Sequence, residues 1–330
     1  MDSAKSQSDE GALRKLFLGP LLERYSLLKN NDLITLAHYT SAKVLLDMLE
    51  KKEVWMRNAR CMNDFSEIDY AKWCIQEYFR DEKRRDAFRL ACENCHEGAF
   101  DFVSKLLDGH LPAIYNRTYI SCLAQHDIED DANGRLSMWR GYGGADVAVS
   151  IVLRKAAVIR DGSGPYGIQG YPVQYPKMDG LFEDLNRRRD IMVENKEEIS
   201  SGSFEYFRNH LFGMFQVLLA TIKHPGFSEE NEWRLIYLPD LNPSKDMEKT
   251  KVQIALNGMP QSIYKIPVNG EKFNDDRAVT VDELIQGIIV GPCAEAGVAI
   301  AAIQDALMRA NHRSAQKIVH FCGIPYRERL

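Results

Sequence analysis

The chain has 330 residues, of which 45% are hydrophobic and 27% are charged, as in an ordinary globular protein. Its formal net charge of −5 argues against a general binder of the nucleic-acid backbone, because such proteins carry an excess of lysine and arginine. The sequence contains no hydrophobic run of about 20 residues, as a membrane span requires, and no hydrophobic signal-peptide region near its start. We therefore expect a cytoplasmic protein with no membrane partner.

The cysteines predict reduced thiols. There are seven, an odd number, scattered between Cys61 and Cys322 rather than arranged as a disulfide framework. The segment from Cys92 to His96 reads C-x-x-C-H, the pattern of covalent haem attachment. That attachment normally accompanies export, and a zinc site would need a second closely spaced ligand pair. We interpret Cys92 and Cys95 as small thiols on a helix face and assign no metal site.

The first part of the chain predicts helices and two strands. Hydrophobic residues recur three and four positions apart over residues 12–28, which favours a helix. A strand is expected over residues 33–41, followed by a helix that Thr40 or Ser41 can cap, because a hydroxyl accepts a hydrogen bond from the first turn. A second strand is expected over residues 53–57.

A helical block follows these strands. Asp64 and Glu67 lie three positions apart at the start of a predicted helix over residues 65–79, as in a capping arrangement. A charged hinge at residues 80–85 leads to a helix that ends near residue 107, and the Gly-His-Leu-Pro segment at 109–112 closes the block. We interpret residues 65–110 as a helical insertion between early strands and the middle of a sheet.

The middle of the chain predicts another strand and a glycine-rich turn. Residues 118–123 form the strand, and the acidic run over residues 127–133 predicts a mobile loop. A short helical turn over residues 136–144 runs into glycines, which allow a close approach of the backbone. A strand is expected over residues 145–153. The G-x-G-x-x-G spacing at 162–167 contains a proline and leads into a predicted strand, so it does not indicate a dinucleotide site.

The segment over residues 229–238 joins a charged start to a hydrophobic strand. Side chains two positions apart share one face of a strand, so Glu230 and Glu232 are expected to point together into a cleft. The alternative is an ion pair between Glu232 and Arg234 or a lysine. Helices precede this segment at 181–198 and 204–222, and strands and a helix follow it, at 252–256, 263–268, 284–290, 294–309 and 317–321.

These elements predict an α+β fold with a mainly antiparallel central sheet and helical insertions, because helices and strands mix without a βαβ rhythm. We find no internal repeat and no linker, and we expect one domain over residues 1–330.

Four polar clusters begin or end the predicted strands. They are His38 with Tyr39 and Thr40, Asn63 and Asp64 with Glu67, Ser121 with Trp139 and Tyr142, and Glu230 and Glu232 with Arg234. Each has a structural interpretation, as a core histidine, a turn and cap, core aromatic residues or an ion pair. Their shared position at strand ends beside glycines favours a common site.

The ordered set of these clusters, with the Ile-Ile-Val-Gly-Pro segment at 288–292, resembles the bacterial family called domain of unknown function 2971. The resemblance runs from about Leu36 to Val319, and the family name implies no reaction. A strand that ends in His-Tyr-Thr and a later Glu-x-Glu strand are also similar to the ADP-ribosyltransferase plan. That similarity implies an ADP-ribosyltransferase-like sheet and NAD as the substrate.

The resemblance implies roles for the clusters. Glu232 would stabilise the oxocarbenium-like ribose left when nicotinamide departs, and Glu230 would orient the acceptor. The first cluster would bind the adenosine half of NAD through His38 and Thr40, with Tyr39 beside them. The remaining implied contacts are Ser121 at the nicotinamide pocket and Trp139 or Tyr142 stacking on a ring. Asn63, Asp64 and Glu67 have no place in the plan, and we interpret them, with Arg234, as substrate contacts or structural residues.

The implied function is an NAD-dependent ADP-ribosyltransferase-like enzyme, or an NAD glycohydrolase, acting on protein or nucleic acid. A toxin or an anti-phage defence effector is the implied role, with a neutralising partner or another defence component as its partner. Two alternatives stay open. One is a non-catalytic module that binds a nucleotide or a nucleic-acid end, and the other is a hydrolase in which Asp64, Glu67, Glu230 and Glu232 hold a divalent metal.

Overall fold

The structure is a computed structural model that describes residues 17–62, 68–142, 146–159, 167–256, 258–271 and 279–325. The chain divides into two compact units. The helical unit comprises Met1–Ser26, Ala59–Thr118 and Val173–Ser228, and the sheet unit comprises Leu27–Asn58, Tyr119–Pro172 and Glu229–Leu330. The helical unit therefore combines a segment at the start of the chain with two insertions into the sheet unit, one between Asn58 and Tyr119 and one between Pro172 and Glu229.

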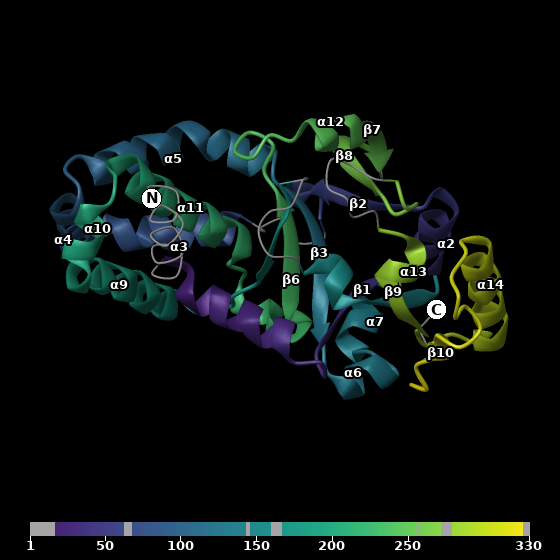
Figure 1. The fold of residues 1–330 in the computed structure, drawn as a ribbon. Helices are drawn as coiled ribbons and strands as arrows, with labels where there is room; N and C mark the ends of the chain where they lie inside the picture. The colour runs from purple at the N-terminus through teal and green to yellow at the C-terminus, as the bar shows by residue number, and fades with distance from the viewer. Residues whose placement is uncertain are drawn as a thin grey trace. The chain divides into compact units, whose positions relative to one another are not determined.

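The sheet unit contains ten described strands in the order β10-β9-β4-β1-β3-β2-β8-β7, with β6 paired to β3 and β5 paired to β6 (Figure 1). All pairs are antiparallel except β9 with β10, which confirms an α+β fold with a mostly antiparallel sheet. The strands are β1 Thr35–Ser41, β2 Glu53–Asn58, β3 Tyr119–His126, β4 Ala148–Leu153, β5 Gln169–Pro172, β6 Glu232–Tyr237, β7 Lys251–Leu256, β8 Met259–Pro267, β9 Ile285–Val290 and β10 Val319–Phe321.

Short helices connect these strands. They are α2 Ala42–Lys51, α6 Ile128–Asn133, α7 Leu136–Tyr142, α8 Lys155–Val158, α12 Lys245–Thr250, α13 Val281–Leu284 and α14 Ala296–Arg309. The predicted cap of α2 is confirmed, because the Val44 N–H donates to Ser41 Oγ at 3.3 Å. The predicted loop over residues 127–133 is wrong. Asp127 Oδ1 accepts from the Asp130 N–H at 3.0 Å, which satisfies an early amide of α6 and allows the acidic run to form a helix.

Six helices form most of the described part of the helical unit: α3 Asp69–Arg80, α4 Glu82–Cys95, α5 Ala99–Asn116, α9 Met178–Glu194, α10 Lys196–Ser201 and α11 Phe204–Thr221. Short 3₁₀ turns form η1 Ala59–Cys61 and η2 Pro225–Glu230, and the unit ends within η2, at Ser228. A further helix covers residues 17–30. Aromatic rings fill the interior of the unit, where the Phe88 ring centroid lies 5.4 Å from that of Phe79 and 6.1 Å from that of Phe215.

The predicted end of a helix near residue 107, with the block closed at 109–112, is also wrong. Helix α5 continues through Gly109 and Pro112 to Asn116, and it packs against α11 with Ile114 buried. Proline lacks an N–H and therefore destabilises a helix interior. Burial of the hydrophobic face of α5 offsets this cost and stabilises the last turns of the helix. Among the described residues, no helix combines the length and hydrophobicity needed to cross a bilayer.

Candidate functional site

Strand β3 has different neighbours along its two edges. One edge pairs with β6 from Tyr119 to Ala124. The other edge pairs with β2 at Tyr119 and Ile120, and with β1 only from Ala124 onward. We call the stretch between Ile120 and Ala124, where neither β1 nor β2 pairs with this edge, the fork.

His38 lies on β1 at the fork. Its Nδ1 lies 2.9 Å from the backbone oxygen of Cys122. In a continuous sheet, a backbone N–H of the neighbouring strand would occupy the position of this nitrogen. A carbonyl oxygen only accepts, so Nδ1 carries the proton and donates. Burial lowers the pKa of His38 below its usual value. The ring is therefore neutral near pH 7, and Nε2 presents a lone pair that can accept a hydrogen bond.

Glu232 and Arg234 form a buried ion pair on β6. Arg234 Nε donates to Glu232 Oε1 at 2.8 Å, and Nη2 lies 3.3 Å from Oε2. The two residues are only 3% and 1% exposed. This two-point contact matches the planar guanidinium to the carboxylate, and it confirms the ion pair that the sequence offered as an alternative.

The expectation that Glu230 and Glu232 share one strand face is wrong. Strand β6 begins at Glu232, whereas Glu230 is the last residue of η2. Asn231, between them, has a φ of 42°, in the left-handed region that asparagine tolerates better than most residues. The two-residue period of a strand therefore does not apply across Asn231.

The register divides the predicted site residues between two faces of the sheet. Ala37 lies opposite Ala124, and Ala124 lies opposite Glu232, so these positions share a face. Alternation along each strand places Tyr39 and Arg234 on that face too. The other face carries His38, Thr40 and Ser121. The structure thus places three of the predicted residues on one face of the sheet and Glu232 on the other. Asn63, Asp64 and Glu67 lie outside the described residues.

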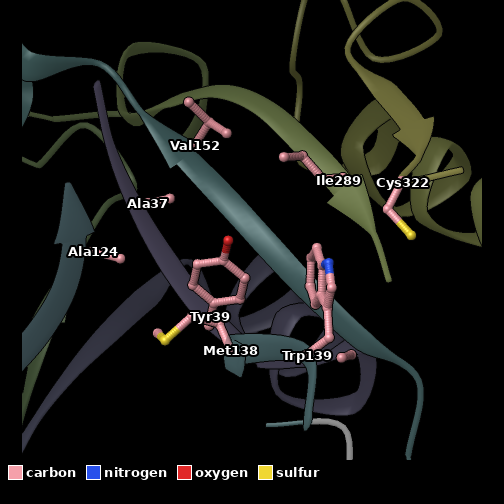
Figure 2. Close-up of a cluster of buried hydrophobic side chains, with 9 residues drawn as sticks. Ala37, Tyr39, Ala124, Met138, Trp139, Val152, Ile289 and Cys322 are labelled. Atoms are coloured by element: carbon pink, nitrogen blue, oxygen red, sulfur yellow. The ribbon is translucent and has the colours of Figure 1, made fainter. Parts of the chain in front are cut away.

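Trp139 belongs to the hydrophobic core beneath β1. It is 2% exposed, its ring centroid lies 4.9 Å from that of Tyr39, and its Nε1 donates to Asn133 O at 3.1 Å (Figure 2). Two glycines make room for its ring. A Cβ at Gly134 would lie 2.1 Å from Trp139 Cζ2, and one at Gly291 would lie 2.9 Å from Cε3. This core position leaves Tyr142, which is only partly buried, as the more accessible aromatic residue of α7.

The structure adds a buried hydrogen-bond chain that the sequence did not predict. His126 has no exposed surface, and its Nδ1 lies 3.0 Å from Asp131 Oδ1 while its Nε2 lies 2.8 Å from Tyr39 Oη. Tyr39 Oη also accepts from the Arg135 N–H at 2.9 Å, and Thr35 Oγ1 donates to Asp131 at 2.6 Å. Tyr39 thus donates to His126, which donates to Asp131. Burial raises the pKa of Tyr39 to about 12, so the hydroxyl keeps its proton at neutral pH.

An open hollow of about 540 Å³ lies beside this chain. Its charged lining residues are Asp130, Glu229, Arg135 and Arg140, whose formal charges cancel. The hollow therefore favours neither an anion nor a cation by net charge.

The C-x-x-C-H segment is a structural part of α4, as the sequence interpretation proposed. Cys92 Sγ lies 3.9 Å from Met192 Sδ, and His96 Nε2 lies 3.1 Å from Ile199 O. Cys92 and Cys95 are buried on one face of the helix, and burial raises the pKa of Cys95 to about 11. In the described part of the chain, no three His, Cys, Asp or Glu residues are grouped as metal ligands.

One family model matches a stretch of the chain that includes part of this site. Residues 138–235 match the DUF2971 family. Its description is a protein of unknown function, and the matched stretch includes most of α7, all of β4 and the Glu232–Arg234 pair. His38 and Ser121 lie before the DUF2971 match. No curated protein and no solved structure matches the chain, and the comparisons give no support for similarity to ADP-ribosyltransferases.

Proposed function

We propose that the chain binds NAD at the fork and transfers its ADP-ribose to a protein or nucleic-acid acceptor, or to water. The observation that carries this proposal is the adjacency of β1, β3 and β6. These strands are distant in sequence, and their register puts His38 and Ser121 on one face of neighbouring strands and Glu232 on the other face, opposite Ala124. A toxin or anti-phage effector of this kind would need a neutralising partner.

The state of His38 supports a contact with a sugar. A neutral ring that offers Nε2 as an acceptor suits a hydroxyl donor, such as a ribose hydroxyl. A fully ionised phosphate offers only acceptors, so it would not pair with that nitrogen. Thr40 and Ser121 share the face of His38 and add hydroxyl groups that both donate and accept.

Glu232 is proposed to stabilise the positive charge that develops on the ribose, as carboxylates do in glycoside cleavage. In the structure its carboxylate faces Arg234 instead. Catalysis by Glu232 therefore requires that NAD binding draw the carboxylate away from Arg234. The alternative is that Glu232 only neutralises Arg234 within the fold.

One set of variants separates these roles. Glu232→Gln alone removes a charge from a buried pair and destabilises the protein, so its loss of activity has two explanations. The double variant Glu232→Gln with Arg234→Gln replaces the pair by two neutral amides that can hydrogen-bond each other. If Glu232 is catalytic, the double variant recovers thermal stability but stays inactive. Recovery of both stability and activity would show that the carboxylate is not catalytic.

The activity itself is tested with purified protein, labelled NAD and a cell lysate. We expect release of nicotinamide and transfer of label to a macromolecule, both unaffected by a chelator. A folded sample that gives neither product overturns the proposal. A thermal shift with NAD but no turnover would indicate a binding module instead, and activity abolished by a chelator would indicate a metal-dependent hydrolase.

A further inference from the structure

Arg135 uses its whole guanidinium group within the sheet unit. Nε donates to Asp130 Oδ2 at 2.9 Å, and Nη2 contacts both Asp130 Oδ2 and the backbone oxygen of Gln125. Nη1 lies 3.2 Å from Glu230 O and 3.4 Å from Glu229 O. A guanidinium has five N–H donors, and these five contacts account for all of them. Arg135 is therefore saturated by protein acceptors and has no donor left for a ligand.

These contacts join three segments of the chain. Gln125 lies at the end of β3, Asp130 lies on α6, and the oxygens of Glu229 and Glu230 belong to the turn before β6. The next residue, Asn231, has the left-handed backbone, and its oxygen accepts from the Gln125 N–H at 2.8 Å. The start of β6 is thus held both by the Arg135 side chain and by the β3 backbone.

We propose that Arg135 is a positioning residue that fixes the start of β6 and thereby the place of the Glu232 carboxylate. Its catalytic consequence rests on the function proposed above, whereas its effect on β6 does not. Lysine cannot replace it, because a single ammonium group cannot reach acceptors on three segments in a fixed plane.

Hydrogen exchange tests the effect on β6 without any activity. In Arg135→Lys we expect the amides of Gln125 and residues 232–234 to exchange at least 10-fold faster than in the wild type. The amides of Ile151 and Ile288, in the paired strands β4 and β9, serve as references and should be unchanged. Arg140→Lys, on α7, is the matched control and should leave the Gln125 amide unchanged. Equal protection of residues 232–234 in wild type and Arg135→Lys overturns the proposal.

A second variant guards against a global loss of structure. If the reference amides of Arg135→Lys also lose protection, Asp130→Asn is measured instead, since it keeps the side-chain shape and removes the charge that faces Arg135. The amide oxygen of asparagine can still accept from the Asp127 N–H, which lies 3.4 Å from Asp130 Oδ2. Faster exchange confined to Gln125 and residues 232–234 supports the proposal. Exchange that is either unchanged or equally faster at the reference amides overturns it.

Kinetics test the catalytic consequence. In Arg135→Lys we expect kcat for nicotinamide release to fall at least 10-fold, while KM for NAD changes less than 3-fold, because His38 and the face that it shares with Ser121 are untouched. Added guanidinium should restore part of kcat in Arg135→Ala but not in Glu232→Gln. A proportional change in kcat and KM overturns the catalytic part. A wild type that does not turn over NAD refutes the proposed function alone, because hydrogen exchange still decides the role of Arg135.

Discussion

The buried pair of Glu232 and Arg234 allows a quantitative test of how this part of the sheet is stabilised. Both side chains are almost wholly enclosed, and two donor nitrogens of Arg234 face two oxygens of Glu232. Glu232→Gln keeps the size of the side chain but removes the negative charge. Arg234 would then remain buried without the carboxylate that it faces.

Removal of one partner of a buried ion pair costs about 3–5 kcal/mol, whereas replacement of both partners is often nearly neutral. We therefore expect Glu232→Gln to lower the free energy of unfolding by about 3–5 kcal/mol. The double variant with Arg234→Gln should lose less than the two single variants added together. The resulting coupling energy should reach about 2 kcal/mol or more, within the range seen for residues in contact.

Urea unfolding followed by tryptophan fluorescence measures these values. The chain has four tryptophans, and Trp73 is the one in the helical unit, where it is 48% exposed. In a Trp73→Phe background the remaining tryptophans report on the sheet unit alone. The exposed Glu229 provides a matched control, because Glu229→Gln should stay within about 0.5 kcal/mol of wild type. A cost below about 1 kcal/mol for Glu232→Gln would refute the view that this carboxylate neutralises a buried Arg234.

Variants at three further positions test the surrounding geometry. Burial lowers the pKa of His38 in the folded protein, so the unfolded chain binds a proton on this imidazole more readily. As the pH falls below about 6.5, the free energy of unfolding should therefore decrease by up to about 1.4 kcal/mol per pH unit, and less steeply in His38→Gln. Equal pH profiles of the two proteins in urea unfolding would contradict this. Asn231→Val should lower the free energy of unfolding by about 1–2 kcal/mol, because a β-branched residue disfavours the left-handed backbone, whereas Asn231→Gly should lower it far less. Equal midpoints of thermal unfolding for the two variants would show that residue 231 does not keep the left-handed backbone. Tyr39→Phe should cost about 1–3 kcal/mol in urea unfolding, because it leaves His126 Nε2 and the Arg135 N–H buried without their partner, and a neutral change would contradict the hydrogen-bond chain.

The strands could be predicted from the sequence wherever local alternation was strong. Strand β6 and strand β1 both lie inside the predicted segments, and Ser41 caps α2 as expected. The predictions failed where longer-range contacts outweigh local preference. An acidic run became α6 once Asp127 capped it, and Pro112 stays within α5 because that helix is packed against α11.

The candidate site was only partly predictable for the same reason. The ion pair between Glu232 and Arg234 was available as an alternative from the sequence, and both residues lie within the strand. The two-residue period of a strand failed for Glu230, because the left-handed backbone of Asn231 separates Glu230 from the start of β6 at Glu232. The chain through His126 and Asp131 depends on the register between β1 and β3, and on a helix that was predicted as a loop. No local pattern specifies that register.

The separation of His38 and Glu232 onto two faces limits how one ligand can contact both. Within a continuous sheet, a ligand on one face would be shielded from the other by the strands. At the fork, however, β1 stops pairing with β3 after Ala37, and the Cys122 oxygen is bridged by a side chain rather than by a strand. Under the proposed function, a dinucleotide bound at the fork would contact the His38 face. It would reach Glu232 only if the carboxylate left Arg234. The ion pair is therefore the step on which the proposed chemistry depends.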